Sequence, residues 1–291
     1  MKPMSVLVAD GDRDLGRSLA GLRKSLALLA AVFFLFPFPG QAASLTLGGT
    51  GAGLATMKLL GEAFQKANPG ITVEVLPSLG SGGGIKALLA GAIDVALTAR
   101  PLKDKERARG VKEFAYAKTA VVLATPMGSA QSNVTNEELV EIFAGTRIAW
   151  PDGTPIYLVL RRPHDSETRI LKAHVPGIDS ALAKARERPG VPVAYTVQDA
   201  ADLIQSRPGG LGTASLSMII AEKRPLKGLS LNGVAPTPET LADGSYPMAK
   251  TFYIVTKPEP NNLVQEFVTF VRSDEGANIL RRMGHLVLRD E

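Results

Sequence analysis

The chain of 291 residues contains no cysteine, which excludes a disulfide scaffold, a zinc site with cysteine ligands and a thiol nucleophile. Aromatic residues make up only 5% of the chain, and the net charge of +5 is not gathered in a Lys/Arg block, so we expect no nucleic-acid partner. Only three scattered histidines occur, His164, His174 and His285, and we therefore expect no metal and no cofactor. The 45% share of hydrophobic residues indicates a folded protein of one large domain or two ordinary ones.

Long apolar runs are also missing, and one short run lies near the start of the chain. It covers residues 26–36, follows two basic residues and is ended by Pro37. A membrane-spanning helix needs about 20 apolar residues. A basic start, a short apolar core and small residues up to Ala42 are typical of a secretory signal peptide. We expect residues 1–42 to be cleaved off, with an uncleaved anchor as the alternative. Because no cysteine follows, we also expect an extracytoplasmic protein without a lipid anchor.

After this segment, short β-branched runs alternate with amphipathic stretches, which predicts an α/β protein with largely parallel sheets. The capping-box pair Thr135 and Glu138 marks the start of one helix. The predicted strands cover residues 44–47, 71–76, 93–97, 120–124, 156–160 and 251–256, and the clearest helices cover about 54–67, 85–90, 196–204 and 262–272.

Three predicted helices start beside hydroxyl groups. Thr50 and Ser81 lie in glycine-rich turns, and Ser166 follows Arg161 and Arg162. A helix N-terminus offers unpaired N–H groups and a partial positive charge, and glycines let an anion approach the backbone. The three turns could therefore converge on one tetrahedral oxyanion. The alternative is that each hydroxyl only caps its own helix.

Catalytic motifs are absent from the sequence. Residues 80–86 lack the Gly-Lys-Ser/Thr ending of a P-loop, and Leu54 stands where a dinucleotide fingerprint needs its third glycine. His164, Asp165 and Ser166 are triad residue types, but neighbours in sequence cannot adopt the triad geometry, and no G-x-S-x-G motif occurs. We therefore expect a protein that is not an enzyme.

Six segments in a characteristic order give the chain a wider resemblance. From Leu45 to Leu288 it resembles the periplasmic phosphate-binding proteins of ABC importers, as a divergent member. The segments are FQKANPGITV from Phe64, GSGGGIKALLAG from Gly80, DVALTARPL from Asp94, LVEIFAG from Leu139, GSYPMAKTFYIVT from Gly244 and FVRSDEGA from Phe270.

The resemblance implies a type II periplasmic-binding-protein fold, in which two α/β lobes with mainly parallel sheets close over an anion. Lobe 1 would comprise residues 44–125 plus 247–291 and lobe 2 residues 126–246, with hinge crossings near Ala124 and Tyr246. It further implies a periplasmic monomer that captures phosphate or a related tetrahedral oxyanion for an ABC permease in the inner membrane.

The same resemblance implies a set of ligand-binding residues. The first lobe would contribute Thr50, Gly51 and Ser81, and the second would contribute Arg162, Ser166 and Thr168.

Two departures from the family pattern qualify this site. Glu167 replaces a glycine and brings a carboxylate to the turn that would hold the anion, where it opposes binding unless it points away. Thr98 to Arg100 occupies a strand end where the family carries an aspartate that can accept a proton from hydrogen phosphate. Without it, the resemblance does not imply that the site distinguishes protonated phosphate from a fully deprotonated oxyanion such as sulfate. Arg100 would either add a cation to the cleft or form a salt bridge between helices. An alternative function is therefore a sensory or interaction module with a membrane sensor as partner and a degenerate anion site.

Overall fold

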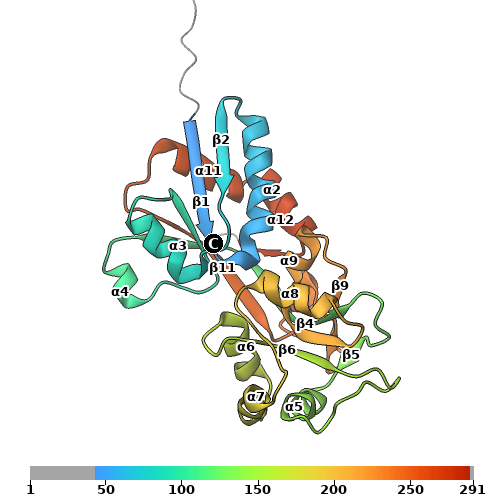
Figure 1. Ribbon diagram of the computed structural model, residues 1–291. Helices are drawn as coiled ribbons and strands as arrows, with labels where there is room; N and C mark the ends of the chain where they lie inside the picture. The colour runs from blue at the N-terminus through green and yellow to red at the C-terminus, as the bar shows by residue number, and fades with distance from the viewer. Residues whose placement is uncertain (1–42, 289–291) are drawn as a thin grey trace, which may run out of the picture. The chain divides into compact units, whose positions relative to one another are not determined.

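The computed structural model describes residues 43–288 (Figure 1), and the predicted signal peptide lies outside the described residues. The strands are β1 (Ala43–Gly49), β2 (Ile71–Val75), β3 (Val95–Thr98), β4 (Lys112–Pro126), β5 (Asn133–Val134), β6 (Tyr157–Arg161), β7 (Val193–Ala194), β8 (Gly210–Ser215), β9 (Leu226–Gly228), β10 (Ser230–Leu231), β11 (Ala249–Thr256) and β12 (Leu286–Val287). The helices are α2 (Gly51–Ala67), α3 (Gly80–Leu89), α4 (Asp104–Arg107), α5 (Asn136–Ala144), α6 (Ser166–His174), α7 (Ile178–Glu187), α8 (Val197–Gln205), α9 (Leu216–Ala221), α10 (Pro238–Ala242), α11 (Asn262–Arg272) and α12 (Asp274–Arg282).

Ten strands form one mixed sheet, in the order β2-β1-β3-β11-β4-β8-β6-β7 with β9 and β12 also paired to β4, and β5 and β10 form a separate two-stranded sheet. Strand β1 pairs in parallel with β2 and β3, and β6 pairs in parallel with β7 and β8. The antiparallel strands β11 and β4 join these two parallel groups. The predicted α/β class with parallel strands is confirmed. The short sequence runs did not indicate that antiparallel strands lie at the centre of the sheet.

Strand β4 is much longer than the sequence predicted. Its apolar run, residues 120–124, was recognised, whereas the preceding residues 112–119 mix charged and apolar side chains and were not. These residues pair with β11 along its whole length, so tertiary pairing supplies the order that local hydrophobicity does not.

Helices α2 and α3 both begin earlier than predicted, within their glycine-rich turns. The close approach of the two turns explains this difference. A Cβ atom at Gly84 would lie 2.8 Å from the Cα atom of Gly49, so only glycine lets the first turn of α3 pack on the end of β1. Gly84, which lies in a run that suggested a loop, is therefore a helical residue packed against backbone.

The apolar core consists of two large clusters and a smaller third one. One large cluster contains buried residues from 120 to 248, and the other combines residues 45–117 and 197 with residues 252–280. Strands β4 and β11 contribute to both. The division into two lobes, residues 44–125 plus 247–291 and residues 126–246, remains a prediction. No helix among residues 43–288 has the length and apolar character needed to cross a membrane.

Candidate anion-binding cleft

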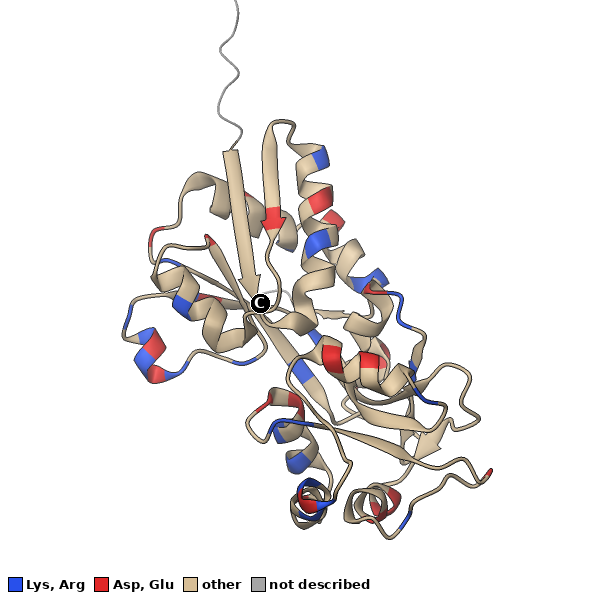
Figure 2. Ribbon diagram, viewed as in Figure 1, with Lys and Arg blue, Asp and Glu red and all other residues tan. Residues whose placement is uncertain are grey.

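A polar cleft of about 440 Å³ lies where the parallel strands β1, β3 and β6 end. Ligands in open α/β sheets bind beyond the carboxyl ends of such strands. Basic residues, blue in Figure 2, lie at the turn between β6 and α6 and within β11. Six of the seven predicted site residues line the cleft, namely Thr50, Gly51, Ser81, Arg100, Arg162 and Ser166.

The turn from β1 into α2 depends on Gly49. This residue has a φ of 147°, and a Cβ atom there would lie 2.1 Å from the carbonyl oxygen of Leu97. The next amide, that of Thr50, donates to the same oxygen at 2.9 Å. The turn thereby presents Thr50 and the first amides of α2 to the cleft, and the Thr50 side chain makes no capping hydrogen bond.

The start of α3 is attached to the same corner. The amide of Leu79 donates to the Gly49 carbonyl oxygen at 3.0 Å. The Ser81 Oγ accepts the amide hydrogen of Ala99 at 3.0 Å. Because its oxygen is already engaged as an acceptor, the Ser81 hydroxyl hydrogen is available to donate to a ligand.

The start of α6 lies on the other side of the cleft. Asp165 occupies the N-cap position, but its carboxylate makes no capping hydrogen bond and instead pairs with Arg161 at 2.8 Å and Arg162 at 3.3 Å. The amides of the first turn are therefore not used by their own N-cap side chain. Ser166 lines the cleft at this helix start.

Thr168 is the predicted site residue that the structure does not bring to the cleft. Its side chain is buried, and its hydroxyl donates to the carbonyl oxygen of Arg162 at 2.9 Å. Thr168 thus stabilises the turn between β6 and α6 from behind, because it lies two residues further round the helix than Ser166.

The three helix starts at the cleft do not fit the alternative in which their hydroxyls only cap helices. No side chain caps α2, α3 or α6. Side-chain caps are present where α5, α8, α10, α11 and α12 begin. The uncapped starts leave N–H groups and hydroxyls available to an anion.

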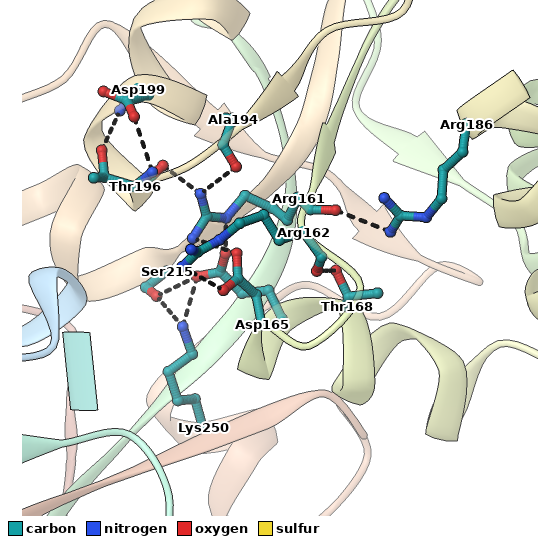
Figure 3. A network of polar contacts seen from close by, with 11 residues as sticks. Arg161, Arg162, Asp165, Thr168, Arg186, Ala194, Thr196, Asp199, Ser215 and Lys250 are labelled. Atoms are coloured by element: carbon teal, nitrogen blue, oxygen red, sulfur yellow. Dashed lines mark hydrogen bonds and ion pairs between the residues drawn. The ribbon is translucent and has the colours of Figure 1, made fainter. Parts of the chain in front are cut away.

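The two adjacent arginines at the end of β6 have different surroundings. The Arg162 side chain is 51% exposed, and its guanidinium lies 5.6 Å from the centre of the Tyr195 ring. Arg161 also lines the cleft, but its side chain is buried. Its buried guanidinium donates to the carbonyl oxygens of Ala194 and Thr196 (Figure 3). Arg162 is therefore the more accessible cation of this pair.

Glu167 points away from the cleft. Its side chain is 1% exposed and its carboxylate contacts Lys250 and Arg161. Burial alone would raise the pKa of Glu167, but the charges of Lys250 and Arg161 outweigh burial and hold the pKa below its ordinary value. The carboxylate is thus ionised. Because two cations lie beside it and neutralise its charge, it does not repel an anion in the cleft as the sequence led us to expect.

Arg100 follows β3 and pairs with Glu106 of α4, so it forms a salt bridge, but one that does not join two helices. It lines the cleft, and its guanidinium forms two hydrogen bonds of 2.8 Å with the carboxylate of Glu106. Hydrogen bonding from Arg100 lowers the pKa of Glu106. The Thr98 hydroxyl donates to the Arg100 carbonyl oxygen at 2.7 Å. Because residues 98–100 are Thr, Ala and Arg, this strand end has no carboxylate of its own.

Sequence reasoning missed several residues that line the cleft, including Arg169, Tyr195 and Lys250. Lys250 stands alone at the start of an apolar strand, and a buried lysine in such a run is the signal that could have drawn attention to it. Arg169 and Tyr195 carry no comparable signal, because exposed residues of both types are common on protein surfaces.

Comparison with known proteins supports the resemblance drawn from the sequence. Residues 37–275 match the family model described as PBP superfamily domain. The phosphate-binding protein PstS of Staphylococcus saprophyticus is 27% identical over 245 residues, which cover 75% of this chain and 72% of the relative. PstS of Bacillus subtilis is 25% identical, with coverages of 85% and 81%.

Solved structures show the same fold. A putative phosphate ABC transporter substrate-binding protein from Clostridium perfringens, with bound phosphate, superposes with a TM-score of 0.71 at 22% identity and covers 84% of this chain and 100% of that one. The molybdate-binding protein of Azotobacter vinelandii superposes with a TM-score of 0.58 at 17% identity, with coverages of 84% and 100%. The chain therefore belongs to the PBP superfamily and has the type II periplasmic-binding-protein fold that its sequence indicated.

Proposed function

We propose that this protein is an extracytoplasmic solute-binding protein that captures phosphate or a related tetrahedral oxyanion for an ABC importer. The observation that carries the proposal is the convergence of three helix starts without side-chain caps, those of α2, α3 and α6, on one basic cleft. The relatives named phosphate-binding protein and phosphate ABC transporter substrate-binding protein support it.

The donors at the cleft match the chemistry of an oxyanion. Ser81 and Thr50 supply hydroxyl donors from one side, and Ser166 with the first amides of α6 supplies donors from the other. Arg162 adds an accessible positive charge. Each hydrogen bond to a charged group contributes roughly 1.5–3 kcal/mol, so several together suffice to hold a small anion in water.

The two sides of the cleft belong to the two proposed lobes, residues 44–125 plus 247–291 and residues 126–246. An anion that bonds to both sides stabilises a closed arrangement over an open one, because only the closed arrangement makes both sets of contacts. Strands β4 and β11, which contribute to both large apolar clusters, would carry the bending. The closed form would then be the one that an ABC permease recognises.

Export is part of the proposal. Residues 1–42 would direct the chain out of the cytoplasm and be removed after Ala42, which leaves a periplasmic monomer without a lipid anchor. N-terminal sequencing of the protein recovered from the periplasmic fraction tests this step. A chain that begins at Ala43 is expected, and a chain that retains its first residues and remains with the membrane would contradict the cleavage.

Calorimetric titration of the purified protein with phosphate, sulfate, molybdate and pyrophosphate tests the binding function. We expect saturable binding of at least one tetrahedral oxyanion with one site per chain, accompanied by a rise in melting temperature. Neither heat nor a melting shift with any of the four anions would refute the proposal.

The alternative of a sensory or interaction module rested on Glu167 as a charge that disables the site. The buried position of Glu167 beside Lys250 removes that motive, so transport is the function we favour. The same proposal includes that the protein is not an enzyme, and turnover of a phosphoester by the pure protein would contradict this part.

A further inference from the structure

Four side chains form a buried ion-pair cluster behind the wall of the cleft. Arg161 and Glu167 come from the neighbouring elements β6 and α6, and Ser215 and Lys250 come from β8 and β11 much later in the sequence. Figure 3 shows Lys250 and Ser215 joined to each other beside the arginine pair. Arg161 and Lys250 line the cleft, whereas Glu167 and Ser215 do not, and the proposed function assigns none of the four to the anion.

The carboxylate of Glu167 is the centre of the cluster. Its Oε1 accepts from Lys250 Nζ at 2.6 Å and from Ser215 Oγ at 3.3 Å, and its Oε2 accepts from Arg161 Nε at 3.2 Å. Lys250 Nζ also donates to Ser215 Oγ at 3.1 Å. The side chains of Glu167 and Lys250 are both 1% exposed. A charge buried this deeply persists only when it is paired, so each partner requires the other.

The cluster joins the start of α6 to a strand that links the two large apolar clusters. Lys250 lies on β11 between Met248, which belongs to the cluster of residues 120–248, and Phe252, which belongs to the other large cluster. Glu167 directly follows Ser166, whose position at the cleft mouth depends on where the first turn of α6 is held. The N-cap side chain does not fix this turn by capping it, because the Asp165 carboxylate is engaged by arginines.

We propose that Glu167 is a positioning residue for oxyanion binding, which holds the first turn of α6 in place through Lys250, Arg161 and Ser215. The inference rests on the proposed function, because its readout is anion affinity. Lys250 lines the cleft, yet its contribution is to fix Glu167 rather than to bind the ligand itself. A glycine at position 167 has no side chain and could not form this attachment. The departure from the family pattern at this position therefore gives the turn a side-chain attachment that glycine cannot provide.

A double-mutant cycle on phosphate affinity tests this role. Glu167→Gln and Lys250→Met are expected to raise the phosphate Kd at least tenfold each, at a temperature where circular dichroism shows a native fold. The phosphate Kd of the double variant is expected to be no higher than that of the single variant that binds less tightly, because both changes break the same contact. Glu141→Gln, which breaks a surface pair with Arg147, is the control and should leave the Kd unchanged.

Several outcomes would overturn the inference. An unchanged Kd with a lowered melting temperature would make the cluster purely structural. Losses that add in the double variant would mean that Lys250 contacts the anion independently of Glu167. Ser215→Ala keeps both charges and should fold even if the other variants do not. It is expected to raise the Kd about threefold and to speed amide hydrogen exchange at residues 166–168, and no change in either would equally refute the role.

The wild-type titration separates this inference from the proposed function. If the wild-type protein binds none of phosphate, sulfate, molybdate and pyrophosphate, the proposed function fails and the positioning role fails with it. If the wild-type protein binds and the variants bind equally well, only the positioning role is wrong.

Discussion

Helices that start at the cleft differ from helices that start elsewhere in the described part of the chain. At α5, α10, α11 and α12, a Thr, Asn or Ser side chain accepts the amide hydrogen of the third helical residue, in the usual N-cap arrangement. At α2, α3 and α6, no side chain does so. The contrast has exceptions on both sides. Helix α8 is capped by Thr196 although that residue lines the cleft, and α4, α7 and α9 start away from the cleft without a side-chain cap hydrogen bond.

The contrast shows that residue type does not decide what a hydroxyl at a helix start does. Thr135 and Thr50 occupy the same N-cap position, yet only Thr135 uses its oxygen for its own helix. A capped helix gains stability and gives up an amide, whereas an uncapped helix keeps the amide for a ligand. Four changes test this contrast, from the largest expected effect to the smallest.

Gly49→Ala should have the largest effect. The new Cβ atom would overlap the carbonyl oxygen of Leu97, and the φ of 147° disfavours any side chain. We expect the free energy of unfolding to fall by about 3 kcal/mol or more. Urea denaturation monitored by circular dichroism measures it. Gly153→Ala, at an open turn, is the matched control and should cost less.

Thr50→Val removes a hydroxyl from an uncapped helix start and retains its shape. We expect the phosphate Kd to rise tenfold or more, as the loss of a hydrogen bond of about 1.5 kcal/mol to an anion implies. The melting temperature should hardly change, because no capping bond is lost. Calorimetric titration and thermal unfolding measure the two quantities. A lowered melting temperature with an unchanged Kd would show that Thr50 behaves like Thr135.

Thr135→Val is the matched change at a capped helix. Here the hydroxyl accepts the amide hydrogen of Glu138 at 3.1 Å, and the Glu138 carboxylate accepts the amide hydrogen of Thr135 at 2.9 Å. We expect the free energy of unfolding to fall by about 1 kcal/mol, with phosphate affinity unchanged. A change in affinity would contradict the assignment of this helix start to stability alone.

Arg100→Gln should have the smallest effect on binding. Glu106 neutralises the Arg100 guanidinium through two hydrogen bonds, so little positive charge is left for a ligand. We expect the phosphate Kd to change by less than about threefold, since a paired and partly exposed charge contributes little. Arg162→Gln, at the accessible arginine, should weaken binding more. Equal losses at the two positions would show that Arg100 binds the anion directly.

Much of the fold was predictable because its signals are local. The apolar periodicity of 262–272 gave α11 with both ends correct, and Thr135 with Glu138 gave the capping box of α5. The first half of β4 was missed because its order comes from pairing with β11, which is distant in sequence. Within the site, the glycine turns and the hydroxyls beside them were recognisable because an anion-binding helix start has a fixed composition.

The sequence by itself determined the fold class, the family and the turns that form the cleft, since all three depend on short patterns and their order along the chain. Only the tertiary structure decided which way each side chain points. Thr168 and Ser166 are two residues apart, yet one is buried behind the turn and the other lines the cleft. From the sequence, Glu167 was expected to oppose anion binding, but in the fold it pairs with Lys250, 83 positions further along the chain. The charge of a side chain is written in the sequence, but its effect on an anion depends on the partner that folding brings to it.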